Sequence, residues 1–358
     1  MGVNSGRGGS GRRLIGRAGG TLELVPRPFS DRPLRGVDLQ IYGPLHGHSS
    51  MANVTRELAR SLGRRLSIGV HSYSRGSLIG EDLKSRRGLD PGAPMALFYG
   101  LPTQVRDPVW GHGTRLLGFA CESDRIPDSW AATCNRFHLV IVPSAYCERA
   151  LRASGVEAPI LVVHHGLEPC YVPGPPRSRG EVFTFFNVVH GNRPERKALR
   201  ELLTAFGRAF GGRRDVRLRL QTRLTDKVRR AFREAGVSPH DPTLTIDERI
   251  LDTENFAALY SAVHCTVHPS HSEGFGIIPL QSIACETPVI ACAATGAAEY
   301  LNAKNAVLLQ SKGLTEEPHV VYATGRHPLI DEEHLVDRLR HVESRWPEEV
   351  AKVRAAAP

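Results

Sequence analysis

Short hydrophobic runs alternate along the chain with longer stretches whose apolar residues recur three or four positions apart. Runs bounded by turn residues predict buried strands, and the longer spacing predicts helices with one apolar face. In the first half, a helix is expected over 51–62, and a second one from Trp130 to the strand at 139–144. Strands are expected at 37–42, 66–70, 95–99, 116–120, 139–144 and 160–167. This alternation predicts an α/β fold built on parallel sheets, although the polar stretch 74–94 has no clear assignment.

The same pattern restarts after a break. Residues 168–180 contain four prolines and two glycines, and this composition is typical of a linker. Helices are then expected at 198–210, 253–263 and from about 334, and strands at 182–188, 216–221, 244–246, 262–267 and 289–291. We therefore expect a basic Gly/Arg-rich leader (1–36), a first domain (37–170), a linker (171–180), a second domain (181–333) and a terminal helix (334–358) that can cross back onto the first domain.

The segment 268–290 carries the clearest chemistry. A strand leads into Glu273-Gly274-Phe275-Gly276, and a helix opened by Pro279 follows. The two glycines let the backbone approach a bound group, while the helix start points free N–H groups and its positive dipole end at the same place. On Gly-Phe-Gly alone, an ordinary strand-to-helix turn explains the pattern equally well.

The complete string from His268 to Ile290 resembles the Glu-x7-Glu signature of the family 4 retaining glycosyltransferases. The resemblance implies that Glu273 and the loop of Gly274, Phe275, Gly276 and Ile277 hold the donor sugar. In the family, a second glutamate binds the ribose of the nucleotide, but Gln281 occupies that position here. An amide can still bond a diol, so ribose binding is expected to survive, whereas the usual nucleotide preference is not assumed.

A second matching segment precedes the strand at 139–144. Glu122, Asp124, Pro127 and Trp130 match the E-x-D-x-(I/L)-P-x-x-W element of a subset of the family. Cys121 stands where many members have a histidine close to the reacting sugar. We expect Glu122 to face the cleft, either binding or deprotonating the acceptor or forming structural hydrogen bonds. Asp124 and Cys121 are assigned to the same region.

A third matching segment, 190–197, lies where a helix is expected to begin. Lys197 matches the lysine that binds the donor diphosphate in the family. Arg193 is our choice for the accompanying arginine and Arg196 the alternate, because the usual Gly-Arg pair reads Gly191-Asn192. A cation at a helix start suits a pyrophosphate. The alternative is that these residues are solvated surface charges.

Two further loops belong to the predicted site. The loop 43–50 follows the first strand and, by the resemblance, faces the cleft, where Gly47, His46, His48 and Ser49 can contact donor or acceptor. Ser49 can instead cap the next helix. Glu299 lies in a turn at 295–301 that matches the family, either near the donor or capping a short helix.

The resemblance implies a GT-B fold, in which two Rossmann-like domains face each other across a cleft. The implied reaction moves a sugar from a nucleotide-diphosphate sugar to a small acceptor, a secondary metabolite or a glycoconjugate, with retention at the anomeric carbon. Glu273, Lys197, Arg193 and Glu122 are the catalytic candidates. Lys197, an arginine and the helix dipole would meet the charge of the leaving diphosphate, so we expect no metal and no cofactor besides the nucleotide sugar.

Two other functions are alternatives to an active glycosyltransferase. The first is a pseudo-glycosyltransferase or another sugar-nucleotide enzyme of the same fold. The second is a catalytically lapsed nucleotide-sugar-binding subunit, which is suggested by Gln281 and by the cysteine at 121.

Composition narrows the remaining classes. The net charge is +9, but it is spread along the chain, and only six of the 46 basic residues are lysines. No nucleic-acid motif accompanies it, so nucleic acid is not expected as a partner, while attraction to an anionic substrate or a membrane surface stays open. No apolar run approaches the length of a membrane span, which favours the cytoplasm. Seven cysteines without a CxxC pair indicate neither a disulfide framework nor a zinc site. Oligomeric state is left open.

Overall fold

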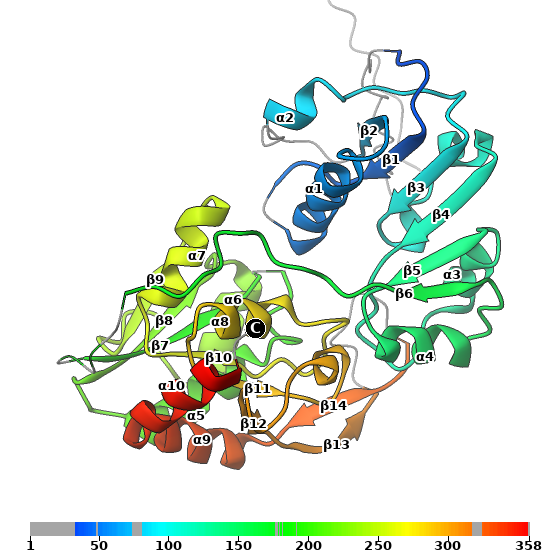
Figure 1. The fold of residues 1–358 in the computed structure, drawn as a ribbon. Coiled ribbons are helices and arrows are strands. Elements are labelled where there is room, and N and C mark those ends of the chain that lie inside the picture. Colours follow the sequence, from blue (N-terminus) through cyan, green and yellow to red (C-terminus); the bar gives the residue numbers. More distant parts are fainter. Residues whose placement is uncertain are drawn as a thin grey trace, which may run out of the picture. The chain divides into compact units, whose positions relative to one another are not determined.

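Two parallel six-stranded sheets organise the unit formed by residues 32–358 in this computed structural model (Figure 1). The structure describes residues 33–47, 49–73, 81–175, 178, 180, 182–190, 192–316 and 324–356. The leader expected at 1–36 therefore lies outside the described residues up to Arg32, and so do His48 and Gly191.

The first half forms the sheet of order β2-β1-β3-β4-β5-β6, in which every neighbouring pair is parallel. Its strands are β1 (Leu39–Gly43), β2 (Ile68–Ser72), β3 (Met95–Tyr99), β4 (Thr114–Gly118), β5 (Leu139–Val142) and β6 (Ile160–Val162). Its helices are α1 (Ser50–Leu62), α2 (Glu81–Lys84), α3 (Asp128–Cys134) and α4 (Ala145–Ala153), with the 3₁₀ turns η1 (Pro102–Gln104) and η2 (Asp107–Gly111). Each of the six strands expected in this half is present.

The second half forms the sheet of order β12-β11-β10-β7-β8-β9, again parallel throughout. Its strands are β7 (Phe183–Val188), β8 (Val216–Gln221), β9 (Leu244–Asp247), β10 (Cys265–His268), β11 (Val289–Cys292) and β12 (Val307–Leu309). Its helices are α5 (Leu199–Phe210), α6 (Asp226–Glu234), α7 (Thr253–Ser261), α8 (Ile277–Ala284), α9 (Glu332–Ser344) and α10 (Trp346–Ala356), with the 3₁₀ turn η3 (Gly296–Glu299). Numbered within this half, the order is 3-2-1-4-5-6, as in dinucleotide-binding folds.

Alternation along the central strand β7 explains why this sheet is covered on both faces. Successive side chains of a strand point to opposite faces. Phe185 packs in the cluster that α5, α6 and α9 complete, whereas Phe186 packs with Tyr260 of α7 on the other face. Both phenylalanines are fully buried. A continuous apolar strand of this kind is typical of a parallel sheet between two helical layers, which Figure 1 shows.

The chain after β12 adds an antiparallel hairpin and two helices. The hairpin pairs β13 (Ser311–Thr315) with β14 (His327–Ile330). The helix expected from 334 is two helices, and both pack on the second half: α9 contacts α5 and β12, and Trp346 at the start of α10 donates from its ring nitrogen to the His264 carbonyl (2.8 Å). These contacts place the terminal helices on the donor side of the predicted cleft.

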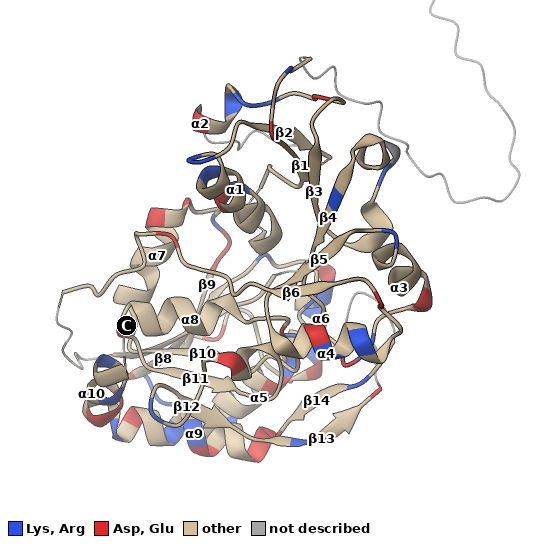
Figure 2. Ribbon diagram, turned by 45° about the vertical axis from the view of Figure 1, so that its right-hand side comes forward, with Lys and Arg blue, Asp and Glu red and all other residues tan. Residues whose placement is uncertain are grey.

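Two expectations from composition concern the spread of basic residues and membrane-spanning helices. Lys and Arg residues, blue in the ribbon of Figure 2, occur on elements of both halves. In the ranges given above, no helix combines the length and the hydropathy that crossing a bilayer requires.

Gly207→Ala is expected to raise the free energy of unfolding by about 0.5–1 kcal/mol, because alanine loses less backbone entropy in a helix than glycine does. Gly207 lies inside α5, and a Cβ there would meet no heavy atom within 4 Å. Urea unfolding of the variant beside the parent checks this. A drop in stability would show that α5 is packed more tightly at this position than the structure indicates.

Candidate active site

The candidate site lies where the direction of winding reverses in the second sheet. Strands β7 and β10 are neighbours there, and the chain leaves them toward helices on opposite faces. Ligands of such sheets bind outside the carboxyl ends of the two strands at this point. The segment after β7 carries Lys197, and the segment after β10 carries Glu273, so the topology brings together two regions that are far apart in the sequence.

The Glu273 carboxylate is the centre of this arrangement. One of its oxygens, Oε1, accepts a hydrogen bond from Lys197 Nζ and lies 3.0 Å from His268 Nε2 and 3.2 Å from a terminal nitrogen of Arg196. All four side chains are at most 14% exposed. Arg196, the alternate arginine, is therefore the one that reaches Glu273.

Burial and charge act in opposite directions on this cluster. Burial raises the pKa of Glu273, but Lys197, Arg196 and the hydrogen bond from His268 outweigh it and hold that pKa well below its usual range. Burial also lowers the pKa of Lys197, and the nearby Arg196 adds to this, while Glu273 opposes it. Lys197 and Arg196 both pair with the Glu273 carboxylate, and an anionic ligand would compete with Glu273 for these two cations.

Glu122 extends the cluster from the first half. Its carboxylate lies 3.8 Å from Arg196, and its carbonyl accepts a hydrogen bond from the Ser272 hydroxyl. Burial raises the pKa of Glu122 above the ordinary value, although Arg196, Lys197 and Arg193 oppose this. Arg193 thus acts on Glu122 through its charge.

Residues 295–300 form hydrogen bonds to the backbone of the glycine loop at both of its ends. Gly276 caps α8 with φ +84°, a left-handed conformation that favours glycine. Its carbonyl accepts a hydrogen bond from the Tyr300 hydroxyl. Gly296 N–H donates to the Glu273 carbonyl (2.9 Å), and Glu273 N–H donates to Thr295 Oγ1 (3.1 Å). Helix α8 begins at Ile277, two residues before the proline expected to open it.

The first half grips the same loop through Gly274. Its carbonyl accepts from the Ser144 hydroxyl (2.6 Å) and from the Cys147 thiol (3.3 Å). A Cβ on Gly274 would lie 2.7 Å from Ala120 Cβ and 2.9 Å from the Cys121 carbonyl oxygen. The absence of a side chain at 274 therefore permits close packing of the two halves.

Phe275 and Glu299 contact the first half as well. The ring of Phe275 packs between His165 (centroids 5.2 Å apart) and Tyr300 (5.4 Å). Glu299 lies in η3, accepts weakly from Tyr146 N–H (3.4 Å) and lies 3.5 Å from His164 Nε2. The turn at 295–301 thus bridges the halves beside the glycine loop.

Gln281 is bonded within the second half. It is 4% exposed, and its Oε1 accepts a hydrogen bond from the Tyr260 hydroxyl (2.7 Å). Its amide group still has donors, but its oxygen already has a protein partner in this structure.

The loop after β1 is organised by α1. Ser49 is the N-cap, and its side chain accepts from Ala52 N–H (3.2 Å). The Gly47 carbonyl accepts from Arg56 of the same helix (2.9 Å), and Gly47 has φ +89°. Burial, with the charges of Arg87 and Arg56, lowers the pKa of His46. His48 lies outside the described residues.

Cys121 and Asp124 have defined partners near Glu122. Cys121 is fully buried beside Cys147, whose thiol lies 3.4 Å from the Cys121 carbonyl oxygen. Asp124 accepts from the backbone N–H and the side chain of Arg326, next to β14 (2.6 and 3.1 Å). Asp124 therefore ties the hairpin to the first half.

Sequence reasoning missed three groups of this site: His268, Ser144 and Cys147. His268 lies at the carboxyl end of β10 and Ser144 just beyond that of β5, and polar side chains collect around ligands at such strand ends. That position is the signal that could have singled them out. Cys147 carries no such signal because its role depends on the contact between the halves.

His165→Gln is expected to make the chain less sensitive to acid. Burial, together with the charge of His164, lowers the pKa of His165 from 6.5 to about 4. A depressed histidine pKa stabilises the fold above 6.5, and this stability is lost as the pH falls toward 4. Between pH 7 and pH 5 the parent should lose about 1–2 kcal/mol more of its unfolding free energy than the variant does.

Urea unfolding at both pH values checks this, with His240→Gln, an exposed histidine, as the matched control. Equal acid sensitivity of the parent and His165→Gln would contradict the burial of the ring.

Comparisons with known proteins concern the fold and one segment of the chain. Residues 250–319, which contain Glu273, the glycine loop, Gln281 and Glu299, match the family model described as glycosyl transferases group 1. No curated protein sequence matches the chain.

Several solved structures share the fold. HepE from Anabaena, solved in complex with UDP and glucose, is 12% identical with a TM-score of 0.68 over 90% of this chain and 94% of its own. The sucrose-phosphate synthase from Thermosynechococcus elongatus is 14% identical (TM-score 0.62; 91% and 94% covered). WaaG, a glycosyltransferase involved in lipopolysaccharide biosynthesis, is 13% identical (TM-score 0.61; 89% and 94% covered).

The fold is GT-B, as expected from the sequence. The matched segment and the fold together support an enzyme of the nucleotide-sugar-dependent glycosyltransferase class.

Proposed function

We propose that this chain transfers a sugar from a nucleotide-diphosphate sugar to a small acceptor, with retention at the anomeric carbon. The observation that carries the proposal is the convergence of Lys197 and Arg196 on Glu273 at the start of the glycine loop. Lys197, Arg196 and Arg193 bring three positive charges to the carboxylates of Glu273 and Glu122, and burying these charges costs free energy, so the arrangement suits a ligand that adds negative charge. The family match over the same loop supports a nucleotide sugar as that anion.

The second half would hold the donor. Lys197 and Arg196, with Arg193 close by, would neutralise the charge that develops on the leaving diphosphate, and the N-terminus of α8 would add its dipole. Glu273 would accept hydrogen bonds from the hydroxyl groups of the sugar. Glu273 pairs with the same cations in the structure, so the diphosphate would take over partners that Glu273 holds.

The first half would present the acceptor. Glu122 is the carboxyl group nearest to Arg196 on that side, and burial makes it easier to protonate than an exposed glutamate. Such a group can hold or receive the proton of an acceptor hydroxyl, a role that needs hydrogen-bond reach. The loop that ends at Ser49 would form the remaining acceptor side, and a secondary metabolite or a glycoconjugate is the acceptor class we propose.

A test begins with thermal shifts of the full chain against UDP, GDP, ADP and TDP. The nucleotide that stabilises the chain is then supplied as its sugar conjugates with candidate acceptors, and NMR determines the anomeric configuration of the product. Retention supports the proposal, and an inverted product contradicts the retaining assignment. No stabilisation by any diphosphate would contradict donor binding itself.

A lapsed nucleotide-sugar-binding subunit is the second candidate, and the hydrogen bond between Gln281 and Tyr260 favours it. That bond occupies the side-chain oxygen at the position expected to hold the ribose. Diphosphate binding without turnover on any donor, and without donor hydrolysis, would favour this candidate over the transferase.

A further inference from the structure

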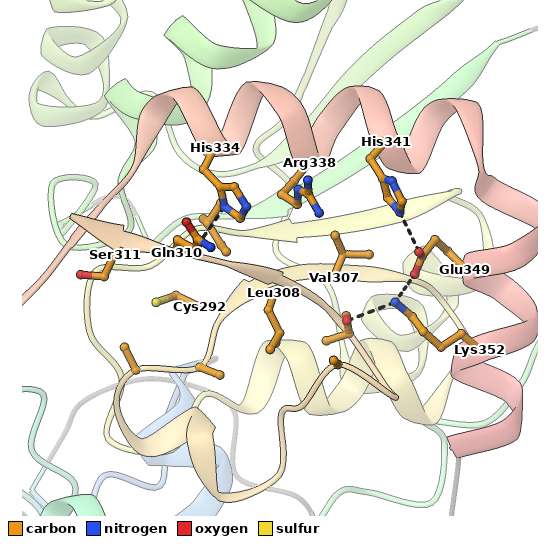
Figure 3. Close-up of a pocket in the computed structure, with 15 residues that line it drawn as sticks. Cys292, Val307, Leu308, Gln310, Ser311, His334, Arg338, His341, Glu349 and Lys352 are labelled. Carbon is orange, nitrogen blue, oxygen red and sulfur yellow. Dashed lines mark hydrogen bonds and ion pairs between the residues drawn. The ribbon is translucent and has the colours of Figure 1, made fainter. Parts of the chain in front are cut away.

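A cavity of about 470 Å³ lies in the second half, beside the edge strand β12 (Figure 3). Its volume is within the usual range for small-molecule sites. One wall is made of small side chains, and α9 and α10 form the opposite wall. Residues of the first wall include Ala293, Ala294, Ala303 and Ala306.

The helical wall presents a row of basic side chains. His334, Arg338 and His341 lie at helical spacing on α9 and therefore share one face. At one end of the row, His341 Nε2 lies 2.9 Å from Glu349, and Lys352 forms an ion pair with the same carboxylate. This end of the cavity is thus internally neutralised.

Arg338 is in a different situation. Its Nε is buried and has no hydrogen-bond partner among the described residues, and no described carboxylate lies within ion-pair distance of its guanidinium. A guanidinium binds carboxylates and phosphates through two parallel hydrogen bonds. An uncompensated guanidinium that lines a cavity is therefore suited to an anionic ligand.

The backbone of β12 supplies a second polar group. Within a strand, the N–H and C=O of successive residues point alternately to the two edges. The Ala306 carbonyl accepts from Lys352 (3.2 Å), and Gln310 N–H donates to His334 Nδ1 (3.0 Å), so the even-numbered residues face away from β11. Leu308 lies between them, lines the cavity, and directs its own N–H to the same side.

We propose that this cavity is a binding site for a small organic anion, whose carboxylate or phosphate group is held by Arg338 while its body lies against the alanine wall. The backbone N–H of Leu308 and the side-chain amide of Gln310 are the further hydrogen-bond donors of the site. This inference stands apart from the transferase proposal, because none of the residues that carry it belongs to the Glu273 cluster.

The test titrates the full chain with glucose 6-phosphate, glucuronate and uncharged glucose by isothermal calorimetry. Binding of at least one anion, with no binding of glucose, is expected. Arg338→Gln should weaken that binding by about tenfold or more, the usual loss for a charge-assisted hydrogen bond. Gln310→Glu should weaken it too, because it places a carboxylate at the site, and this second variant leaves the helix unchanged.

Two matched variants control for charge and for location. Arg340→Gln removes the same charge from an exposed position on α9, and Lys197→Gln alters the candidate donor site. Both should stay within about twofold of the parent. If Arg338→Gln weakens the binding of glucose 6-phosphate or of glucuronate but not of both, the proposal holds, and the affected anion shows whether Arg338 binds a phosphate or a carboxylate. Equal binding of glucose, absence of anion binding, unchanged binding in Arg338→Gln, or an equal loss in either control would overturn the proposal.

Discussion

Lys197→Ala is expected to lower kcat/KM for the nucleotide-sugar donor by about two to three orders of magnitude, the usual effect of removing one group that stabilises developing negative charge. Lys197 precedes α5 and donates to Glu273 from a buried position. Without it, Arg196 remains as the cation that contacts Glu273, and the diphosphate meets less positive charge. Initial rates over a range of donor concentrations give the effect, and calorimetry with the nucleoside diphosphate separates binding from turnover.

Lys227→Ala provides the matched control. Lys227 belongs to α6 of the same half, is exposed, and donates to the Asn192 carbonyl (3.3 Å). It carries the same charge as Lys197 but has no contact with Glu273. Equal loss of activity in the two variants would mean that Lys197 acts through net charge alone. Full activity of Lys197→Ala would remove the phosphate assignment.

Gly296→Ala is expected to displace the donor loop. A Cβ at this position would lie 2.1 Å from the Gly274 carbonyl oxygen and 2.7 Å from Phe275 N, so backbone would have to move. Overpacking of this kind costs about 1–3 kcal/mol of stability. The shift would also break the bond from Gly296 N–H to the Glu273 carbonyl, and we expect nucleotide binding to fall at least as much as in Lys197→Ala.

Urea unfolding and calorimetry measure both effects. Gly166→Ala is the control, since a Cβ there meets nothing within 4 Å and Gly166 has no positive φ. Parent-like stability together with parent-like nucleotide binding in Gly296→Ala would show that the loop has room that the structure does not indicate.

Most of the fold could be predicted because parallel strands are read from apolar runs. Strands β3 and β8 have the bounds expected from the sequence, and the expected first and second sheets are both present. The β13–β14 hairpin was not predicted, because β13 is mostly exposed and lacks an apolar pattern. The long final helix divides at Arg345, which caps α9, and Pro347 in the first turn of α10 is the residue in the sequence that marks this point.

Only some residues of the candidate site could be predicted from the sequence. The resemblance to the family motifs selected Glu273, Lys197 and Glu122, and these lie close together around Arg196. Spacing could not choose between Arg193 and Arg196, because the choice depends on how the segment before α5 turns. Nor could it show that the Gln281 oxygen bonds Tyr260, a contact between two helices. The prediction of what these residues bind remains to be tested.

The hydrogen bonds from Ser144 and Cys147 to the Gly274 carbonyl have a consequence for protein engineering. Exchanging the donor half for that of a relative, in order to change the sugar, would join a foreign loop to this hydroxyl and thiol. If the grafted loop has a side chain at the position of Gly274, its Cβ would clash with Ala120. The clash would displace the loop and disturb donor binding whatever sugar the graft is chosen for. Chimaeras of this enzyme should therefore carry residues 120–147 along with the donor half.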